Sequence, residues 1–135
     1  MRELDKIKVK DVMRDTVTFV DGSIDVLEAM KVMKKAKTTS LIVKKRTDDD
    51  EYGMILFSDI AKQVIAKDRA PQRVNAFEVM AKPVVSVRPD MSIRFCARLF
   101  ENFGISHAPV IDQQNVVGIV SYYTLVLGAI DLGDD

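Results

Sequence analysis

Gly53–Ile60, with the sequence GMILFSDI, carries the signal on which the fold of the whole chain depends, and Gly118–Leu125, GIVSYYTL, repeats it. Each stretch has a glycine, two apolar residues, a short turn and the start of a helix with apolar periodicity. Each also follows a short run suited to a β-strand, Ser40–Lys44 in the first case and Ala108–Ile111 in the second. A strand–turn–helix signal that occurs twice in a chain of 135 residues indicates an internal duplication.

The two copies align with a nearly constant offset. It is 67 residues at most matched positions and 65 at the glycines. The two-residue change falls inside the charged loop Lys44–Glu51, and loops tolerate insertions better than helices or strands do. The matched positions are Val12–Met13 with Val79–Met80, Val17 with Val84, Val20 with Val87, Ala29 with Cys96, Val43 with Val110, and Gly53 with Gly118.

Each copy has the same predicted order of elements, strand–helix–strand–strand–helix. The polar stretch Lys67–Arg73 separates the copies, and the linker is set at residues 67–74, between a first repeat at 8–66 and a second at 75–130. The elements expected in the first copy are Thr16–Val20, Ile24–Lys37, Ser40–Lys44, Tyr52–Leu56 and Asp59–Ala66, the last capped by Ser58. Those expected in the second copy are Val84–Val87, Met91–Phe103 closed by Gly104, Ala108–Ile111, Val116–Val120 and Tyr122–Ile130.

Composition excludes several classes of protein. Twenty basic and twenty acidic residues cancel, so no overall charge favours nucleic acid or an anionic membrane. No apolar run approaches the roughly 20 residues that a membrane-spanning helix needs, and the N-terminus lacks the apolar core of a signal peptide. The single cysteine, Cys96, rules out an internal disulfide framework. We therefore expect a cytoplasmic protein.

The order of these pieces, with Val12–Met13, Ile105–Asp112 and Gly118–Ser121 and their repeats, resembles the CBS domain, named after cystathionine β-synthase. The duplication resembles the tandem CBS pair, or Bateman module, over about residues 8 to 130. The resemblance implies an α/β fold of two pseudo-symmetric β-α-β-β-α repeats that form one compact module with two equivalent clefts. CBS pairs commonly form flat, disc-like homodimers through their helices. The resemblance therefore implies a homodimer, here through Ile24–Lys37 and Met91–Phe103.

The usual ligands of the family are adenosine compounds such as AMP, ADP, ATP, NAD or S-adenosylmethionine. In the family, a Gly-h-h-Thr-x-x-Asp turn (h, apolar) presents oxygen acceptors to a ribose diol, and the following helix start favours phosphate. Both turns of this chain depart from the pattern. In the first, Leu56 replaces the Ser or Thr while Asp59 is kept; in the second, Ser121 is kept while Thr124 replaces the Asp.

The resemblance therefore gives two unequal candidate clefts, and we favour the one that retains the carboxylate. That cleft combines Asp59 and the adjacent Ser58 with Pro83, Val84, Val85, Ser106 and His107. The other cleft combines Ser121 and Thr124 with Thr16, Val17, Thr18, Thr38 and Thr39. The plainer alternatives are that Asp59 is an ordinary first-turn helix residue and that Ser121 is a simple N-cap.

Catalysis has no support in the sequence. There is no nucleophile elbow or Gly-rich phosphate loop, and one His with one Cys cannot supply a metal site with the usual ligand spacing. Cys96 follows the apolar pattern of a helix, which favours a buried, inert thiol over a catalytic pair with His107.

Two functions remain open. The first is a regulatory module that senses an adenosine compound and requires no cofactor, with AMP, ADP, ATP or NAD as ligand. The second is a structural dimerisation module whose clefts bind no nucleotide. We expect a homodimer and a separate, unidentified effector protein, and we expect neither nucleic acid nor a membrane as partner.

Overall fold

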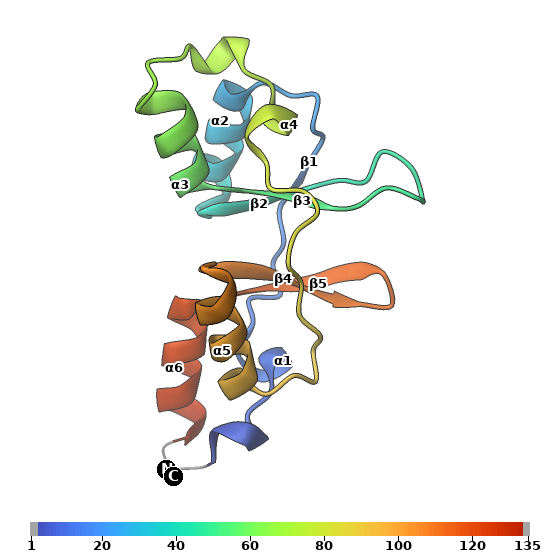
Figure 1. Cartoon of the computed structure of the whole chain (residues 1–135), viewed down its shortest axis with the longest axis vertical. Coiled ribbons are helices and arrows are strands. Elements are labelled where there is room, and N and C mark those ends of the chain that lie inside the picture. Colours follow the sequence, from blue (N-terminus) through green and yellow to red (C-terminus); the bar gives the residue numbers. More distant parts are fainter. Residues whose placement is uncertain (1–2, 134–135) are drawn as a thin grey trace. The chain divides into compact units, whose positions relative to one another are not determined.

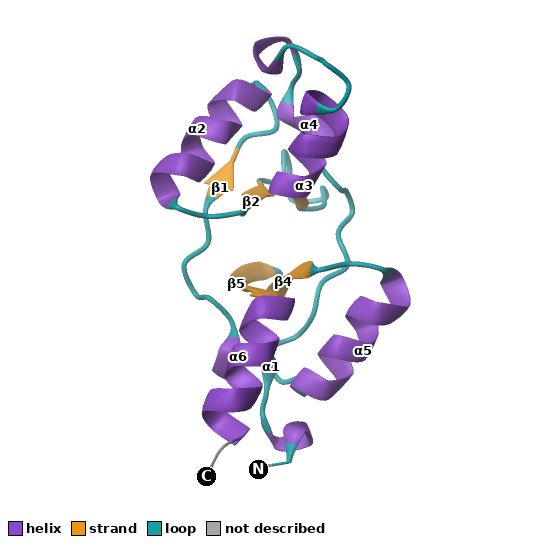
Figure 2. Cartoon of the chain, turned by 90° about the vertical axis from the view of Figure 1, so that its left-hand side faces the viewer, coloured by secondary structure: helices purple, strands orange, loops and turns teal. Residues whose placement is uncertain are grey.

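The computed structural model describes residues 3–133, which form two compact units of α/β structure. The central unit contains residues 18–84, and the terminal unit joins residues 3–17 to residues 85–133. In each unit the helices lie on one side of a small sheet (Figures 1 and 2). This is the α/β fold with two related halves that the duplication predicts.

The central unit is built on a three-stranded sheet in the order β1-β2-β3. β1 runs parallel to β2, and β2 forms an antiparallel hairpin with β3 in which Ser40 lies opposite Leu56. α2 has an amphipathic pattern and packs Ala29 and Met33 against the sheet. The elements are β1 (Phe19–Val20), α2 (Val26–Ala36), β2 (Ser40–Val43), β3 (Gly53–Leu56), α3 (Phe57–Ile60) with a π-helical turn η2 (Ala61–Ile65), the 3-10 turn η3 (Pro71–Arg73) and α4 (Ala76–Val79).

The terminal unit has a two-stranded antiparallel sheet joined by a tight turn. Gln113 and Gln114 both have positive φ, as a two-residue hairpin turn of type I′ requires. Phe100 of α5 and Leu125 of α6 are buried beneath the sheet. The elements are a 3-10 turn η1 (Leu4–Lys6), α1 (Val9–Val12), α5 (Ile93–Phe103), β4 (His107–Asp112), β5 (Asn115–Ser121) and α6 (Tyr122–Gly133).

Four sequence predictions need correction. The strand predicted at Val84–Val87 is reduced to one parallel bridge between Val87 and Val110, and the strand predicted at Thr16–Val20 is only its last two residues. Ser58 does not cap the next helix, because that helix begins at Phe57 with Leu56 at the cap position, ahead of the predicted start at Asp59. A β-branched run predicts extended backbone, but strand pairing depends on a neighbour that the local sequence does not reveal.

Each unit combines the short leading helix of one sequence repeat with the hairpin of the other. Arg14, just after α1, pairs with Ile119 of β5, and Ala81, just after α4, pairs with Met54 of β3. The spatial units therefore differ from the stretches 8–66 and 75–130 that the repeat pattern delimits along the chain. The placement of domain boundaries at those residues stays a prediction.

The repeated glycines are explained by this packing. A Cβ on Gly118 would lie 2.5 Å from Met13 Sδ and 2.8 Å from the Arg14 carbonyl oxygen. A Cβ on Gly53 would lie 2.7 Å from Met80 Sδ and 3.3 Å from the Ala81 carbonyl oxygen. In both units the methionine of the leading segment packs on the strand at the glycine. The repeated Val-Met pair and the repeated glycine are therefore the two sides of the same contact.

Candidate functional site

The turn between β3 and α3 holds the carboxylate that the sequence singles out. Asp59 is the third residue of α3, and its Oδ2 accepts a hydrogen bond from the Leu56 N–H at 2.8 Å. The side chain is half-buried, whereas the neighbouring Ser58 is exposed. Asp59 thus caps the start of α3, because the first N–H groups of a helix lack partners and a carboxylate at the third position can accept from one of them. This hydrogen bond holds the carboxylate at the turn.

The predicted threonines of the central unit lie at the same end of its sheet. The Phe57 N–H donates to the Thr39 carbonyl at 3.0 Å, and the Ile42 N–H donates to the Thr18 carbonyl at 2.9 Å. Thr38 is buried, and its Oγ1 donates to the Ser40 carbonyl at 3.1 Å while accepting from the Ser40 N–H. The hydroxyl of Thr38 is therefore committed to the backbone, whereas Thr39 is exposed beside the Asp59 turn.

Pro83 and Val84 belong to the central unit but not to this end of it. Ala81 pairs antiparallel with Met54, so the chain beyond it runs away from Leu56 toward the hairpin loop. Val85 belongs to the terminal unit. Of the residues predicted for the favoured cleft, the central unit thus gathers only Ser58 and Asp59 at the turn itself.

In the terminal unit the corresponding turn is closed by two hydroxyls. The Thr124 N–H donates to Ser121 Oγ at 3.2 Å, and the Ser121 N–H donates to Thr124 Oγ1 at 2.9 Å. Thr124 Oγ1 in turn donates to the Ser121 carbonyl at 3.0 Å. Ser121 is thus an N-cap, and Thr124 uses its hydroxyl proton and one lone pair on the backbone of the turn.

The terminal unit also brings Ser106 and His107 to this turn. His107 pairs with Ser121 across the hairpin, and the Tyr122 N–H donates to the Ser106 carbonyl at 3.2 Å. Ser106 Oγ lies 2.8 Å from His107 Nδ1. Sequence reasoning grouped Ser106 and His107 with Asp59, but within the terminal unit they are neighbours of Ser121.

Thr16 and Val17 also lie in the terminal unit, after α1 and beyond the bridge between Arg14 and Ile119. Thr16 is exposed and Val17 is half-buried. Each predicted cleft therefore draws residues from both units, and the assembly of either full set stays a prediction. Reasoning from motifs could not show that the hydroxyls of Thr38, Ser121 and Thr124 already bond to the backbone of the turns.

Cys96 and the possible metal ligands are the other chemistry-bearing groups that the sequence raised. Burial raises the pKa of the Cys96 thiol to about 11, so it stays protonated at neutral pH. Within residues 3–133, no group of three or more His, Cys, Asp or Glu side chains is arranged to hold a metal ion. None of the helices in that range is both long and apolar enough to cross a bilayer.

Comparison with known proteins supplies the family context. The model of the CBS domain matches twice, at residues 9–66 and 76–128. CBS domain-containing protein YhcV of Bacillus subtilis is 33% identical over 113 residues, covering 84% of this chain and 79% of YhcV. A homoserine O-acetyltransferase of Methanosalsum zhilinae is 36% identical over 120 residues, which are 87% of this chain but only 23% of that enzyme.

Two groups of solved structures are also similar. A hexameric CBS-CP12 protein from bloom-forming cyanobacteria has a TM-score of 0.90 at 33% identity, covering 94% of this chain and 73% of its own. The CBS domain pair of protein MJ0100, solved with 5'-methylthioadenosine and S-adenosyl-L-methionine, has a TM-score of 0.77 at 25% identity, covering 95% and 98%. The chain spans a quarter or less of the acetyltransferases it matches, so their named activity does not transfer to it.

Proposed function

This chain belongs to the CBS-domain family as a tandem pair of CBS domains, and we propose that it is a regulatory module that senses an adenosine-containing small molecule. The proposal covers AMP, ADP, ATP and NAD as ligands, with the Asp59 turn as the main contact. It includes a separate effector protein and a cytoplasmic location, and it assigns no catalytic step to the chain.

The observation that carries the proposal is the Asp59 carboxylate at the start of α3. One of its oxygens accepts the Leu56 N–H, and a carboxylate offers about four lone-pair sites, so acceptor capacity remains for a ribose diol. The side chain is held in place by its own cap, which lowers the entropy lost on binding. Thr39 is exposed at the same end of the sheet, and its carbonyl accepts the Phe57 N–H at the start of α3.

The relatives support the ligand class. 5'-methylthioadenosine and S-adenosyl-L-methionine, which the MJ0100 pair binds, share the adenosine group and differ at the 5' position. A ribose diol on Asp59 is consistent with that shared part and leaves the 5' substituent open. We further propose that the 5' substituent is a phosphate, as in AMP, ADP, ATP or NAD.

Binding is tested by thermal shift and calorimetry on ligand-free protein with AMP, ADP, ATP, NAD, S-adenosylmethionine and 5'-methylthioadenosine. A ligand at about 100 times its Kd adds about 2.7 kcal/mol to stability. At about 2–8 °C per kcal/mol, that raises the Tm by several degrees. No shift with any of the six would move the assignment to the structural module.

Variants separate the two turns. Asp59→Asn keeps an oxygen for the Leu56 N–H while it removes the charge, and it should weaken binding by about tenfold or more, since hydrogen bonds to charged groups contribute roughly 1.5–3 kcal/mol. Ser121→Ala should weaken binding far less. The reverse ranking would place the ligand at the Ser121 turn.

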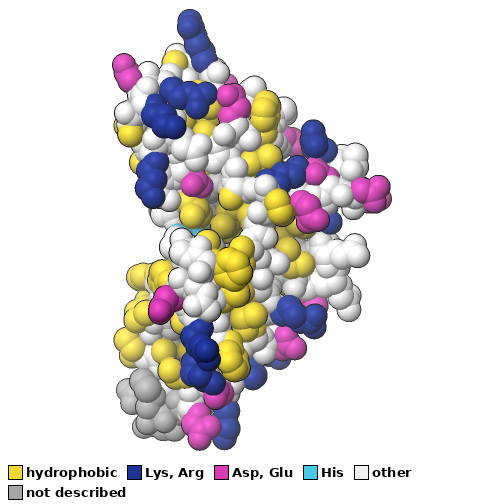
Figure 3. Space-filling view, viewed as in Figure 1, with side chains coloured by type: hydrophobic (Ala, Val, Ile, Leu, Met, Phe, Trp, Pro, Cys, Tyr) yellow, Lys and Arg dark blue, Asp and Glu magenta, His cyan; other side chains and the backbone are white. Residues whose placement is uncertain are grey.

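A second role, homodimerisation, is favoured by one surface. Tyr123, Val126, Leu127 and Ile130 follow helical i, i+3, i+4, i+7 spacing on α6, and all four are exposed. Figure 3 shows hydrophobic side chains gathered over α6. By contrast, no large apolar side chain of α2 is among the exposed ones, so of the two predicted dimer helices only α5, with Phe95 and Phe103, presents such residues.

We propose that a second copy of this chain covers the α6 stripe. Light scattering of the wild-type protein should give a dimer, and Val126→Lys with Ile130→Lys should give a monomer with an unchanged circular dichroism spectrum. Ile65→Lys, an equally exposed apolar position in the central unit, serves as the matched control. A wild-type monomer at all accessible concentrations contradicts the dimer.

A further inference from the structure

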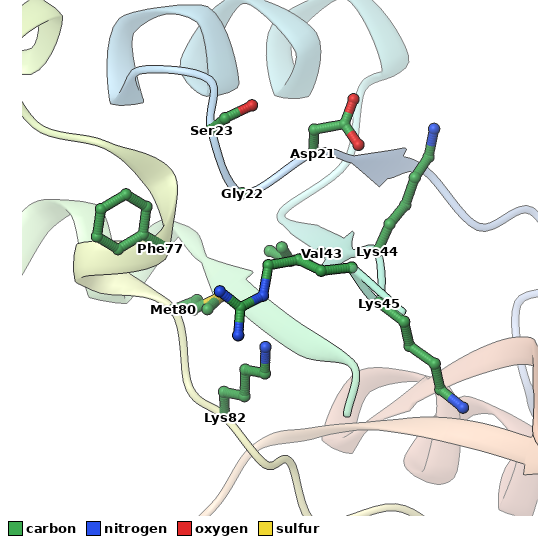
Figure 4. A pocket seen from close by; sticks show the side chains of 10 residues that line it. Asp21, Gly22, Ser23, Val43, Lys44, Lys45, Phe77, Met80 and Lys82 are labelled. Atoms are coloured by element: carbon green, nitrogen blue, oxygen red, sulfur yellow. The ribbon is translucent and has the colours of Figure 1, made fainter. Parts of the chain in front are cut away.

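A cavity of about 770 Å³ lies within the central unit, at the hairpin-loop end of its sheet. Its walls come from three segments: the loop before α2, the end of β2 with the residues after it, and α4 with the residues after it (Figure 4). The cavity is within the 300–1,000 Å³ range typical of small-molecule sites. The residues that line it are Asp21, Gly22, Ser23, Val43, Lys44, Lys45, Arg46, Phe77, Met80 and Lys82.

The lining carries a surplus of positive charge. Lys44, Lys45, Arg46 and Lys82 are cationic, and Asp21 is the only acidic residue among the ten. The protein as a whole is neutral, so this local excess is a property of the cavity and not of the composition. Cations around a concave surface reinforce one another in attracting an anion.

One neighbouring carboxylate organises these cations. Asp50 Oδ1 lies 2.8 Å from Lys82 Nζ, and Asp50 Oδ2 accepts the Arg46 backbone N–H at 2.8 Å. The hydrogen bond from Lys82, together with the backbone bonds from Arg46 and Glu51, holds the pKa of Asp50 far below its usual range. Asp50 therefore stays ionised and positions Lys82, and the two acidic side chains together still leave two of the four positive charges unbalanced.

The opposite wall of the cavity is apolar. Phe77, Val43 and Met80 line it, and the Phe77 ring is about half exposed at 53%. The Phe77 N–H donates to the Gly22 carbonyl at 3.1 Å, which ties α4 to the loop before α2. Gly22 leaves the space open, since a Cβ there would already be 3.3 Å from Val43 and 3.6 Å from Phe77. In Figure 4 the Phe77 ring and the Lys82 ammonium face the same space from different segments.

We propose that this cavity binds a small organic phosphate whose planar apolar group packs on Phe77 while its phosphate contacts Arg46 and Lys82, the two cations that converge on Asp50. Phosphate suits several convergent ammonium and guanidinium donors, and an exposed aromatic ring favours a planar partner. This site uses none of the residues of the Asp59 or Ser121 turns. It is independent of the proposed adenosine site and stands or falls separately.

The test is an NMR titration of the 15N-labelled full chain with phenyl phosphate, with phenol and inorganic phosphate as separate probes. Saturable shifts of the Gly22, Phe77 and Lys82 amides with phenyl phosphate, and weaker binding of either fragment alone, support the site. Shifts confined to other amides, or no saturation, overturn it. Equal affinity for inorganic phosphate and phenyl phosphate overturns the apolar half of the proposal.

Variants assign the two walls. Arg46→Gln should weaken phenyl phosphate binding by about tenfold, and Phe77→Ala by about threefold to tenfold. The matched control is Lys34→Gln, which removes the same charge from the exposed face of α2 in the same unit. Equal loss in the control would show that the cavity cations attract anions only through net charge, and it would overturn the site.

Discussion

The Asp59 turn and the Ser121 turn solve the same structural problem with different chemistry. At the start of α3, the Asp59 carboxylate accepts the Leu56 N–H, and at the start of α6, Thr124 Oγ1 accepts the Ser121 N–H. Thr124 also spends its proton on the Ser121 carbonyl. The comparison teaches that capping alone does not require a charge. The turn that kept an aspartate has acceptor capacity beyond its structural role, and for that reason we place the ribose contact there.

The largest difference between the units should appear at the repeated glycines. A methionine sulfur is the closest atom at both positions, but the Cβ of Gly118→Ala would lie 2.8 Å from the Arg14 carbonyl oxygen, whereas that of Gly53→Ala would lie 3.3 Å from the Ala81 carbonyl oxygen. We expect Gly118→Ala to lower the free energy of unfolding by about 1–3 kcal/mol and Gly53→Ala by clearly less. Urea denaturation of both variants measures this. Equal losses would mean that the two leading segments pack alike.

A smaller difference should appear where α2 and α5 end. Lys37 and Gly104 are equivalent positions, and both adopt the left-handed conformation, with φ of 55° and 64°. Both helices close with the same pair of backbone hydrogen bonds. Gly104→Ala meets no neighbouring atom within 4 Å, so its cost of about 1–2 kcal/mol would be backbone strain alone.

The reverse change, Lys37→Gly, should stabilise the folded protein slightly. Glycine removes the backbone strain at this position, and we expect that gain to exceed the loss from the greater freedom of the unfolded chain. Lys37→Gly should raise the Tm slightly. A lower Tm for Lys37→Gly would show that the lysine side chain contributes more than its backbone costs.

The hairpin loops differ in their dependence on pH. The loop of the central unit holds Asp50 with Lys82 and Arg46, whereas the hairpin of the terminal unit turns in two residues. Since the pKa of Asp50 is lowered in the folded state, chiefly by the Lys82 hydrogen bond, its contribution is present above the unfolded pKa and is lost as pH falls below about 4. The Tm difference between wild type and Asp50→Asn should therefore shrink in acid. A difference that stays constant down to acidic pH would contradict it.

The smallest effect concerns the buried thiol. Cys96 occupies the position of Ala29 in the other repeat, and its raised pKa leaves almost no thiolate at neutral pH. Ellman's reagent should react slowly with the folded protein and fast after denaturation. Cys96→Ala, which restores the match to Ala29, provides the unreactive control. Rapid reaction of the native protein would mean that α5 opens readily.

Much of the fold follows from the sequence, because the relevant forces are local. Apolar periodicity located α2, α5 and α6 to within a few residues, the glycine at position 104 marked the end of α5, and the strands predicted at Ala108–Ile111 and Val116–Val120 are present as β4 and β5. The duplication itself is confirmed by the two matches to the CBS-domain model. These features depend on neighbours within a few positions along the chain, so a single sequence can reveal them.

The rest depended on contacts between distant segments. The strand predicted at Val84–Val87 is only a bridge, and each leading helix packs with the hairpin of the other repeat. No local pattern shows that Thr39 lies beside the Asp59 turn or that Lys44, Phe77 and Lys82 surround one cavity. The sequence by itself determined the repeats, the helices and the candidate turns. Only the tertiary structure decided which side chains share a site, because that depends on packing between residues that the chain order keeps far apart.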